Sequence, residues 1–124
     1  NKIMDAFSLP KKTDEEKAAR QQAVQEATRY ATEVPFKTMN LCYECMSVAK
    51  AMAEIGNPNS VTDAGVGALA ARAGVMGAFL NVKINAAGLE DKAFAEKIIQ
   101  EGETIAAKAN QLEAEILQIV NSKI

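Results

Sequence analysis

The sequence predicts an all-α fold, an antiparallel bundle of long helices formed by a single domain over residues 1–124. Apolar residues recur at helical spacing over long stretches, and glycine or proline separates these stretches. No window alternates apolar and polar residues with turn signals at both ends, so strands are not expected. With 124 residues and 48% hydrophobic content, the chain can bury one modest core.

The first half of the chain is expected to contain three helical segments. Residues 1–9 resemble the last turns of a helix that a proline ends. A T-x-x-E pattern at Thr13 is typical of a capping box and opens a helix predicted to cover residues 13–33. Pro35 suits the first turn of a new helix, predicted to carry apolar residues over 35–53 before a Gly-x-Pro ends it.

The segment from Ser60 to Gly88 is predicted to form the central helix. At about 100° per residue, one face of this helix carries only small or polar side chains. These are Asp63, Gly67, Ala70, Gly74, Gly77, Asn81 and Asn85. Most of the remaining circumference is apolar, as in a helix packed between others. Each glycine costs a helix about 1 kcal/mol relative to alanine, so we expect a neighbouring helix or a ligand to approach this face closely.

The last segment, from Glu90 to Ser122, is predicted to form one helix whose apolar residues recur about every 3.5 positions. At a rise of about 1.5 Å per residue, this helix would exceed about 40 Å if Gly102 does not break it. Long apolar stripes of this kind favour a homo-oligomer, a dimer or larger, over a monomer.

Composition excludes several classes of function. The net charge is −2 and no cluster of Lys and Arg alternates with aromatic residues, so no nucleic-acid partner is expected. The longest uncharged apolar run is about half of the roughly 20 residues that a membrane span needs, and no secretory signal is visible. We therefore expect a cytoplasmic protein with no membrane partner. The absence of histidine excludes Ser-His-Asp and Cys-His catalysis within this chain.

Cys42 and Cys45 have the C-x-x-C spacing of a redox pair or of half a zinc site. They lie in a predicted helix among leucine and methionine, and neither a second pair nor a histidine completes four ligands. We interpret both thiols as small buried hydrophobic groups, and we predict no metal site and no tightly bound cofactor.

Asp63 is the candidate for proton transfer, and two interpretations of it remain open. As the third residue after Ser60, it can bond back to the helix cap and favour the positive helix end. Alternatively, the apolar helices beside it disfavour its charged form, which suits a general acid. Asn57, Asn59 and Ser60 form a polar turn at the same helix end, whose free N–H groups can bind a carboxylate or phosphate.

Asn81, Lys83 and Asn85 interrupt the apolar run near the other end of this helix. A buried amide costs about 1 to 3 kcal/mol when unsatisfied, so the two asparagines predict a hydrogen-bond network, either between helices or with a ligand. Asp63 and Asn81 share an azimuth but lie about 27 Å apart along an unbroken helix. They therefore serve opposite ends of an extended ligand, belong to different sites, or meet through a second copy of the chain.

The stretch from Val34 to Asp91, and above all its blocks GNPNSVTDAG and GAFLNVKIN, resembles the cyclodeaminase/cyclohydrolase family. Residues 1–20 are similar to this family too, so the resemblance covers nearly the whole chain. It implies an all-α bundle that associates as a dimer. Family members carry a further helical region with an S-P-G-G-G-S-like segment before the part that matches Asn1. We therefore expect the chain to be the C-terminal part of a cyclodeaminase-type domain.

The resemblance implies a folate one-carbon enzyme, an ammonia-lyase that converts 5-formimidoyltetrahydrofolate to 5,10-methenyltetrahydrofolate. Because N10 attacks an amidine carbon held on N5, proximity supplies much of the catalysis. Asp63 is the hypothesised proton-transfer residue. The hypothesised substrate-binding residues are Asn57, Asn59, Ser60, Asn81, Lys83 and Asn85. Two alternatives stay open: a methenyltetrahydrofolate cyclohydrolase, and a helical assembly module without catalysis.

Overall fold

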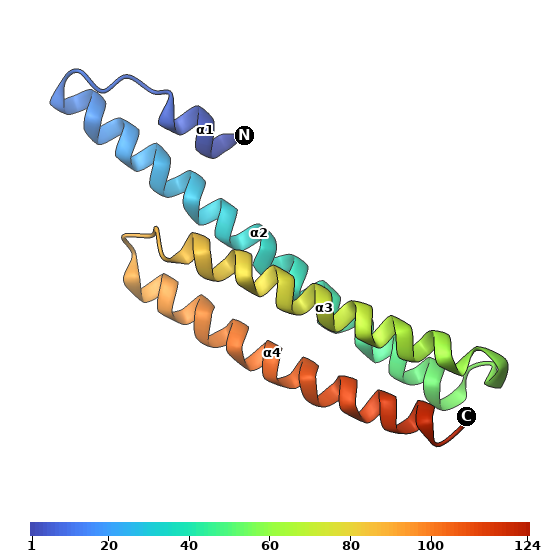
Figure 1. Cartoon of the computed structure of the whole chain (residues 1–124). Coiled ribbons are helices and arrows are strands. Elements are labelled where there is room, and N and C mark those ends of the chain that lie inside the picture. The colour runs from blue at the N-terminus through green and yellow to red at the C-terminus, as the bar shows by residue number, and fades with distance from the viewer.

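A computed structural model describes all of residues 1–124, and it contains no strand. Its elements are α1 (Lys2–Phe7), α2 (Asp14–Ile55), the 3-10 turn η1 (Pro58–Ser60), α3 (Val61–Ala86) and α4 (Lys92–Asn121). The helices α2, α3 and α4 lie side by side and alternate in direction (Figure 1). The predicted all-α antiparallel bundle is confirmed.

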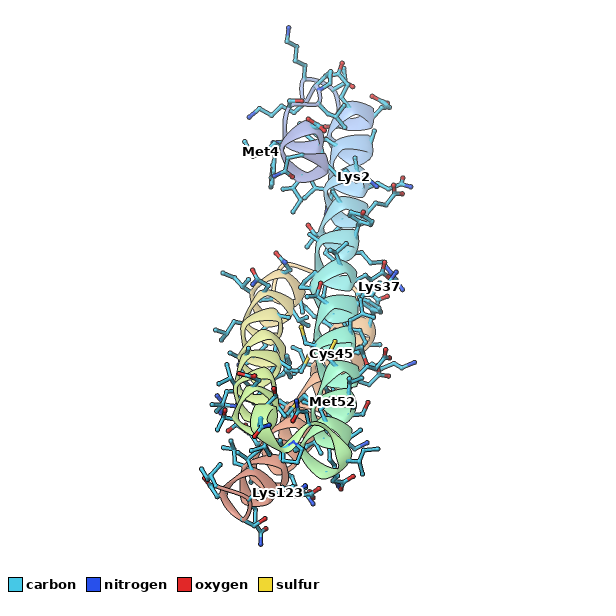
Figure 2. All side chains as sticks on the ribbon, turned by 90° about the vertical axis from the view of Figure 1, so that its right-hand side faces the viewer. Lys2, Met4, Lys37, Cys45, Met52 and Lys123 are labelled. Atoms are coloured by element: carbon cyan, nitrogen blue, oxygen red, sulfur yellow. The ribbon has the colours of Figure 1, made fainter.

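The first turns of α2 extend beyond the ends of α3 and α4, and only α1 folds back on them (Figure 1). Lys2 and Met4 of α1 therefore lie at the opposite end of the molecule from Lys123 (Figure 2). Arg20 holds α1 in place, because its Nε and Nη2 both donate to the Phe7 carbonyl, at 3.2 and 3.0 Å. The capping box predicted at Thr13 is present and starts α2.

The prediction of two helices separated near Pro35 is wrong, because α2 continues through this proline for 42 residues. A proline inside a helix leaves the carbonyl four residues earlier without its N–H partner. Here that carbonyl belongs to Ala31, and the Asn85 side chain of α3 donates to it from Nδ2 at 2.8 Å. The neighbouring helix thus replaces the hydrogen bond that Pro35 removes, and α2 remains intact.

The core lies along one side of α3, where α2 and α4 enclose it. Ala68, Val75 and Val82 recur every seven residues on this side and are fully buried. Phe79 packs against Gly102 of α4 so closely that a methyl group on Gly102 would overlap its ring. Gly102 therefore serves helix packing, and α4 runs unbroken for 30 residues as the sequence predicted.

The glycines of α3 have different surroundings. A methyl group on Gly74 would lie 2.7 Å from Sγ of Cys42, so α2 approaches α3 closely there. At Gly67 and Gly77 nothing lies within 4 Å of the same position. Among the glycines of the predicted face, close approach by a neighbouring helix therefore occurs only at Gly74 within the single chain.

Two further contacts fix the ends of the bundle. Lys123 donates from Nζ to the carbonyls of Ala53 and Glu54, at 2.6 and 2.7 Å, and so caps the last turn of α2. At the other end, Gln25 of α2 donates to the Gly88 carbonyl and accepts from the Glu90 N–H, at 3.2 and 2.9 Å. These bonds hold the α3–α4 turn against α2. The turn η1 between α2 and α3 is thereby held at the opposite end of the bundle, beside the C-terminus.

Candidate functional site

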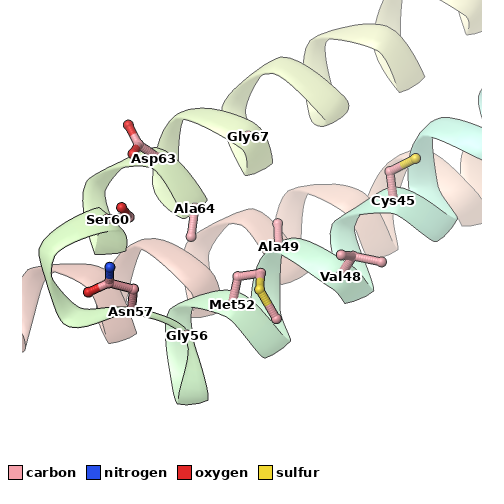
Figure 3. Close-up of a pocket in the computed structure, with 10 residues that line it drawn as sticks. All are labelled: Cys45, Val48, Ala49, Met52, Gly56, Asn57, Ser60, Asp63, Ala64 and Gly67. Atoms are coloured by element: carbon pink, nitrogen blue, oxygen red, sulfur yellow. The ribbon is translucent and has the colours of Figure 1, made fainter.

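A groove of about 490 Å³ lies between the last turns of α2 and the first turns of α3. Two helices and the turn between them supply its lining, and the groove runs along the crease between α2 and α3 (Figure 3). Its ten lining residues are Cys45, Val48, Ala49, Met52, Gly56, Asn57, Ser60, Asp63, Ala64 and Gly67. A partly apolar concavity with a few polar groups at one end is the usual form of a small-molecule site.

The polar end of the groove brings together three of the predicted site residues, Asn57, Ser60 and Asp63 (Figure 3). Asn57 precedes η1, and its Oδ1 accepts a hydrogen bond from the Asn59 N–H at 3.0 Å. The Asn57 Nδ2 makes no hydrogen bond within the chain and keeps both of its donors for a ligand. Asn59 follows in the same turn, but its side chain does not line the groove.

Asp63 lies in the first turn of α3 and is exposed. The cap interpretation has no hydrogen bond to support it, because Ser60 stands at the N-cap position of α3 without a side-chain cap bond. None of the seven ion pairs in the chain includes Asp63. The carboxylate therefore retains its proton-accepting oxygens, but the apolar surroundings expected for a general acid are not supplied by this chain alone.

The apolar wall of the groove comes from α2, and sequence reasoning did not assign it to a site. Cys45, Val48 and Met52 share one exposed side of this helix along the groove (Figure 3). The interpretation of both cysteines as buried is wrong for Cys45, which is exposed, whereas Cys42 is half-buried against Gly74. The one available signal was the spacing of three and four residues among Cys45, Val48 and Met52, which places them on one helix face.

The three predicted residues at the far end of α3 do not reach this groove. Because α3 is unbroken, Asn81 lies about 27 Å from Asp63 along the helix axis. Asn81 is exposed and donates to the Gly77 carbonyl at 3.1 Å, and the Lys83 Nζ lies 4.7 Å from the centre of the Phe79 ring. Asn85 donates to the Ala31 carbonyl of α2. Of the two alternatives predicted for the asparagines, a hydrogen bond between helices or one to a ligand, Asn85 makes the first.

No group of three or more Cys, Asp or Glu side chains is arranged to hold a metal ion. The groove contains one carboxylate, one amide and one hydroxyl, a set suited to hydrogen bonding and proton transfer.

Comparison with known proteins shows which family the chain belongs to. A family model described as formiminotransferase-cyclodeaminase matches residues 1–104, which include every groove residue. The chain belongs to this family. The family resemblance read from the sequence is thereby confirmed.

Individual relatives carry two different names. A methenyltetrahydrofolate cyclohydrolase of Methylorubrum extorquens is 48% identical over 122 residues, covering 98% of this chain and 59% of that protein. The formimidoyltransferase-cyclodeaminase of Mus musculus is 36% identical over 111 residues, covering 84% of this chain and 20% of that protein. The formimidoyltransferase-cyclodeaminase of Gallus gallus is 32% identical over 120 residues, covering 97% of this chain and 22% of that protein. The chain thus spans less than two thirds of the length of each of these relatives, from 59% down to about a fifth.

Proposed function

We propose that this chain forms part of an enzyme that acts on a reduced folate at the carbon between N5 and N10. The groove between α2 and α3 is the observation that carries the proposal. Its apolar wall suits a flat pterin ring, and the free Nδ2 donors of Asn57 suit the edge of a heterocycle. Asp63 stands at the same end as the amide and provides the proton-transfer group.

Ring opening of 5,10-methenyltetrahydrofolate by water is the reaction we propose first. The relative whose name carries this activity is 48% identical over nearly the whole chain, against 36% for the mouse cyclodeaminase. Water adds to the methenyl carbon, one carbon–nitrogen bond of the five-membered ring breaks, and a formyltetrahydrofolate results. Asp63 takes the proton of the attacking water and returns it to the departing ring nitrogen.

Cyclodeamination is the second candidate, favoured by the family model and by the relatives from mouse and chicken. N10 of 5-formimidoyltetrahydrofolate attacks the amidine carbon on N5, and the bond from that carbon to the terminal nitrogen breaks once this nitrogen is protonated. Both reactions pass through a tetrahedral carbon held by N5 and N10, so one carboxylate at one position can serve either of them.

The other predicted site residues differ in what they can contribute to folate binding, because only some of them line the groove. Asn57 and Ser60 bind the pterin at the polar end, and Asn59 keeps the turn in shape through its N–H bond to Asn57. Asn81 and Lys83 are available to a ligand or to a second copy of the chain, because both are exposed. Asn85 supports α2 through one Nδ2 hydrogen and keeps its Oδ1 and its second Nδ2 hydrogen for a ligand.

The two reactions have different readouts. Purified protein is incubated with methenyltetrahydrofolate, and loss of the methenyl absorbance is followed; a parallel sample with formimidoyltetrahydrofolate is assayed for ammonia. We expect the first signal. Ammonia release without hydrolysis would instead establish the cyclodeaminase, and failure of isothermal titration to detect saturable binding of either folate would contradict the proposal.

Asp63→Asn tests the assigned residue. General acid–base catalysis contributes roughly 10²- to 10⁴-fold, so we expect turnover to fall by at least about 100-fold while folate binding persists. Asp14→Asn is the matched control, since Asp14 is also an exposed aspartate in the first turn of a long helix. Near-normal turnover in a folded Asp63→Asn protein would remove Asp63 from the mechanism.

A further inference from the structure

The side-chain amide of Asn57 has one fixed orientation at the polar end of the groove. Its Oδ1 accepts from the Asn59 N–H at 3.0 Å, and an amide NH2 group cannot accept that bond, so the oxygen and not the nitrogen faces Asn59. The Nδ2 lies on the other side of the amide, nearer to Ser60 in Figure 3. A ligand at this end of the groove therefore meets the free Nδ2 donors of Asn57.

The groove presents its groups in a fixed order along α3. Ser60, Asp63 and Gly67 follow one another along the helix axis and span about 10 Å. Asn57 lies before them, and Cys45 of α2 lies at the far end (Figure 3). At Gly67 nothing lies within 4 Å of the position of a methyl group, so the groove is open there. From one end to the other, a ligand meets an amide donor, a carboxylate and open space beside an apolar wall.

A reduced folate carries matching groups in the same order. The oxo oxygen on C4 of its pterin lies beside N5, the reacting carbon joins N5 to N10, and the p-aminobenzoyl ring follows on N10. Among the acceptors of the pterin, this oxygen is next to the reacting carbon, whereas N1 lies across the ring system. With the reacting carbon at Asp63, the 4-oxo group falls at Asn57 and the aminobenzoyl ring at Gly67. The opposite direction would place an apolar ring against the Asn57 donors and leave them unpaired.

We propose that Asn57 donates from Nδ2 to the 4-oxo oxygen of the pterin and makes the groove selective for 4-oxo over 4-amino pterins. A 4-amino group would present its own hydrogens to the Nδ2 donors, and donors on both sides would then lack an acceptor. Asn57 is on this basis a specificity-determining residue, and proton transfer stays with Asp63. This role of Asn57 rests on the proposed folate function, because it needs a pterin in the groove.

Two ligands that differ in the C4 substituent test this selectivity. Tetrahydrofolate and its 4-amino analogue are titrated into the protein by anaerobic calorimetry. A neutral hydrogen bond is worth about a factor of ten in affinity, so we expect the wild type to bind tetrahydrofolate at least about tenfold more tightly. Equal affinities, or tighter binding of the 4-amino analogue, would overturn the proposal.

Asn57→Asp separates recognition of the ligand from support of the turn η1. One carboxylate oxygen can still accept from the Asn59 N–H, while the second oxygen replaces the Nδ2 donors with an acceptor. We expect the preference to reverse in favour of the 4-amino analogue, and the ratio of the two affinities to change by about 100-fold. An unchanged ratio in a folded variant would show that Asn57 only shapes the turn.

Asn59→Asp is the matched control for the added charge. It introduces the same carboxylate in the same turn, but the side chain at this position does not line the groove. We therefore expect the ratio of the two affinities to stay near its wild-type value. A ratio that moves as far in Asn59→Asp as in Asn57→Asp would overturn the proposal, because the effect would then come from charge near Asp63 and not from a direct hydrogen bond.

The exposed thiol of Cys45 reports the direction of the bound ligand. Cys45 lines the far end of the groove, where the aminobenzoyl ring is expected. Alkylation by iodoacetamide is followed by site-resolved mass spectrometry, with the half-buried Cys42 as internal reference. Tetrahydrofolate should slow alkylation of Cys45, and a tetrahydropterin without the aminobenzoyl tail should not. Equal protection by the two ligands would place the pterin at Cys45 and overturn the contact with Asn57.

The outcomes distinguish this role of Asn57 from the proposed function. Turnover of a folate by the wild type, with an Asn57→Asp ratio that does not move, would refute the contact with the 4-oxo group alone. A reversed ratio without turnover of either substrate would refute the proposed reactions and leave recognition of the pterin standing. Absence of saturable tetrahydrofolate binding would refute both.

Discussion

The two sides of α3 are equally apolar and have opposite surroundings. Val75 and Val82 on the inner side are fully buried, whereas Val66, Leu80 and Ile84 on the outer side are 64, 63 and 73% exposed. Hydrophobicity alone therefore does not locate the core of this protein. What decides burial is which neighbour the rest of the chain supplies: α2 and α4 enclose one side, and no other helix of this chain lies over the outward side (Figure 1).

The largest expected effect is on stability, and it comes from placing the same charge on the inner and on the outer side of α3. Val75→Asp places an unpaired carboxylate in the core, which costs about 3 to 5 kcal/mol and leaves little folded protein. Val66→Asp adds the same charge on the exposed side, and we expect its helical circular dichroism and its urea midpoint to stay close to those of the wild type. Equal urea midpoints for the two variants would contradict the distinction between inner and outer sides.

Glycine substitutions compare the same two sides at the level of a methyl group. Gly102→Ala pushes a methyl group into the Phe79 ring, and overpacking of this kind costs about 1 to 3 kcal/mol. Gly77→Ala meets nothing within 4 Å, so helix propensity should stabilise the monomer by up to about 1 kcal/mol. Urea unfolding at low protein concentration measures the free energy of unfolding of both variants. We expect it to fall for Gly102→Ala and to rise for Gly77→Ala.

The bond between Asn85 and Ala31 tests how the inner side of α3 supports α2. Asn85→Ala removes the donor that satisfies this carbonyl, and we expect a loss of about 1 kcal/mol in the free energy of unfolding. Pro35→Ala restores a backbone N–H for the same carbonyl, so Asn85→Ala should cost less in that background. The double-mutant cycle measures this coupling, and purely additive effects would refute the link between the two residues.

Pro35 also shows what the sequence could predict of the fold. Helix class, the capping box at Thr13 and the extents of α3 and α4 followed from local patterns, because local interactions produce them. Continuity of α2 did not, since it depends on an asparagine fifty residues later in the sequence. A residue that favours a helix start by its own geometry was overridden by a tertiary hydrogen bond.

The candidate site divides in the same way. Asn57, Ser60 and Asp63 were predicted together because a single turn and a helix start carry them. The α2 wall with Cys45 and Met52 was missed as a site, since only the rotation of α2 against α3 decides which of its apolar residues border the groove (Figure 3). Asn81 is the reverse case: it shares the predicted helix face with Asp63, but it lies about 27 Å away along α3 and does not line the groove.

The smallest expected effect lies on the far side of the bundle, between α2 and α4. Lys50 donates to Glu115 at 3.2 Å, and this bond, together with one from Gln111, lowers the pKa of Glu115 from its ordinary value near 4.5. A carboxyl whose pKa is lower in the folded state stabilises the fold above the unfolded pKa, and this contribution disappears as the pH falls through the folded pKa.

Lys50→Met should therefore reduce the free energy of unfolding slightly near neutral pH and not at all in stronger acid, where Glu115 is protonated in both proteins. The effect is small because the two side chains are 37 and 42% exposed, so solvent screens the pair. Lys97→Met, which removes an exposed pair within α4, is the matched control. A larger loss in acid than near neutrality would contradict the assignment, because it would mean that Lys50 acts through packing and not through the Glu115 charge.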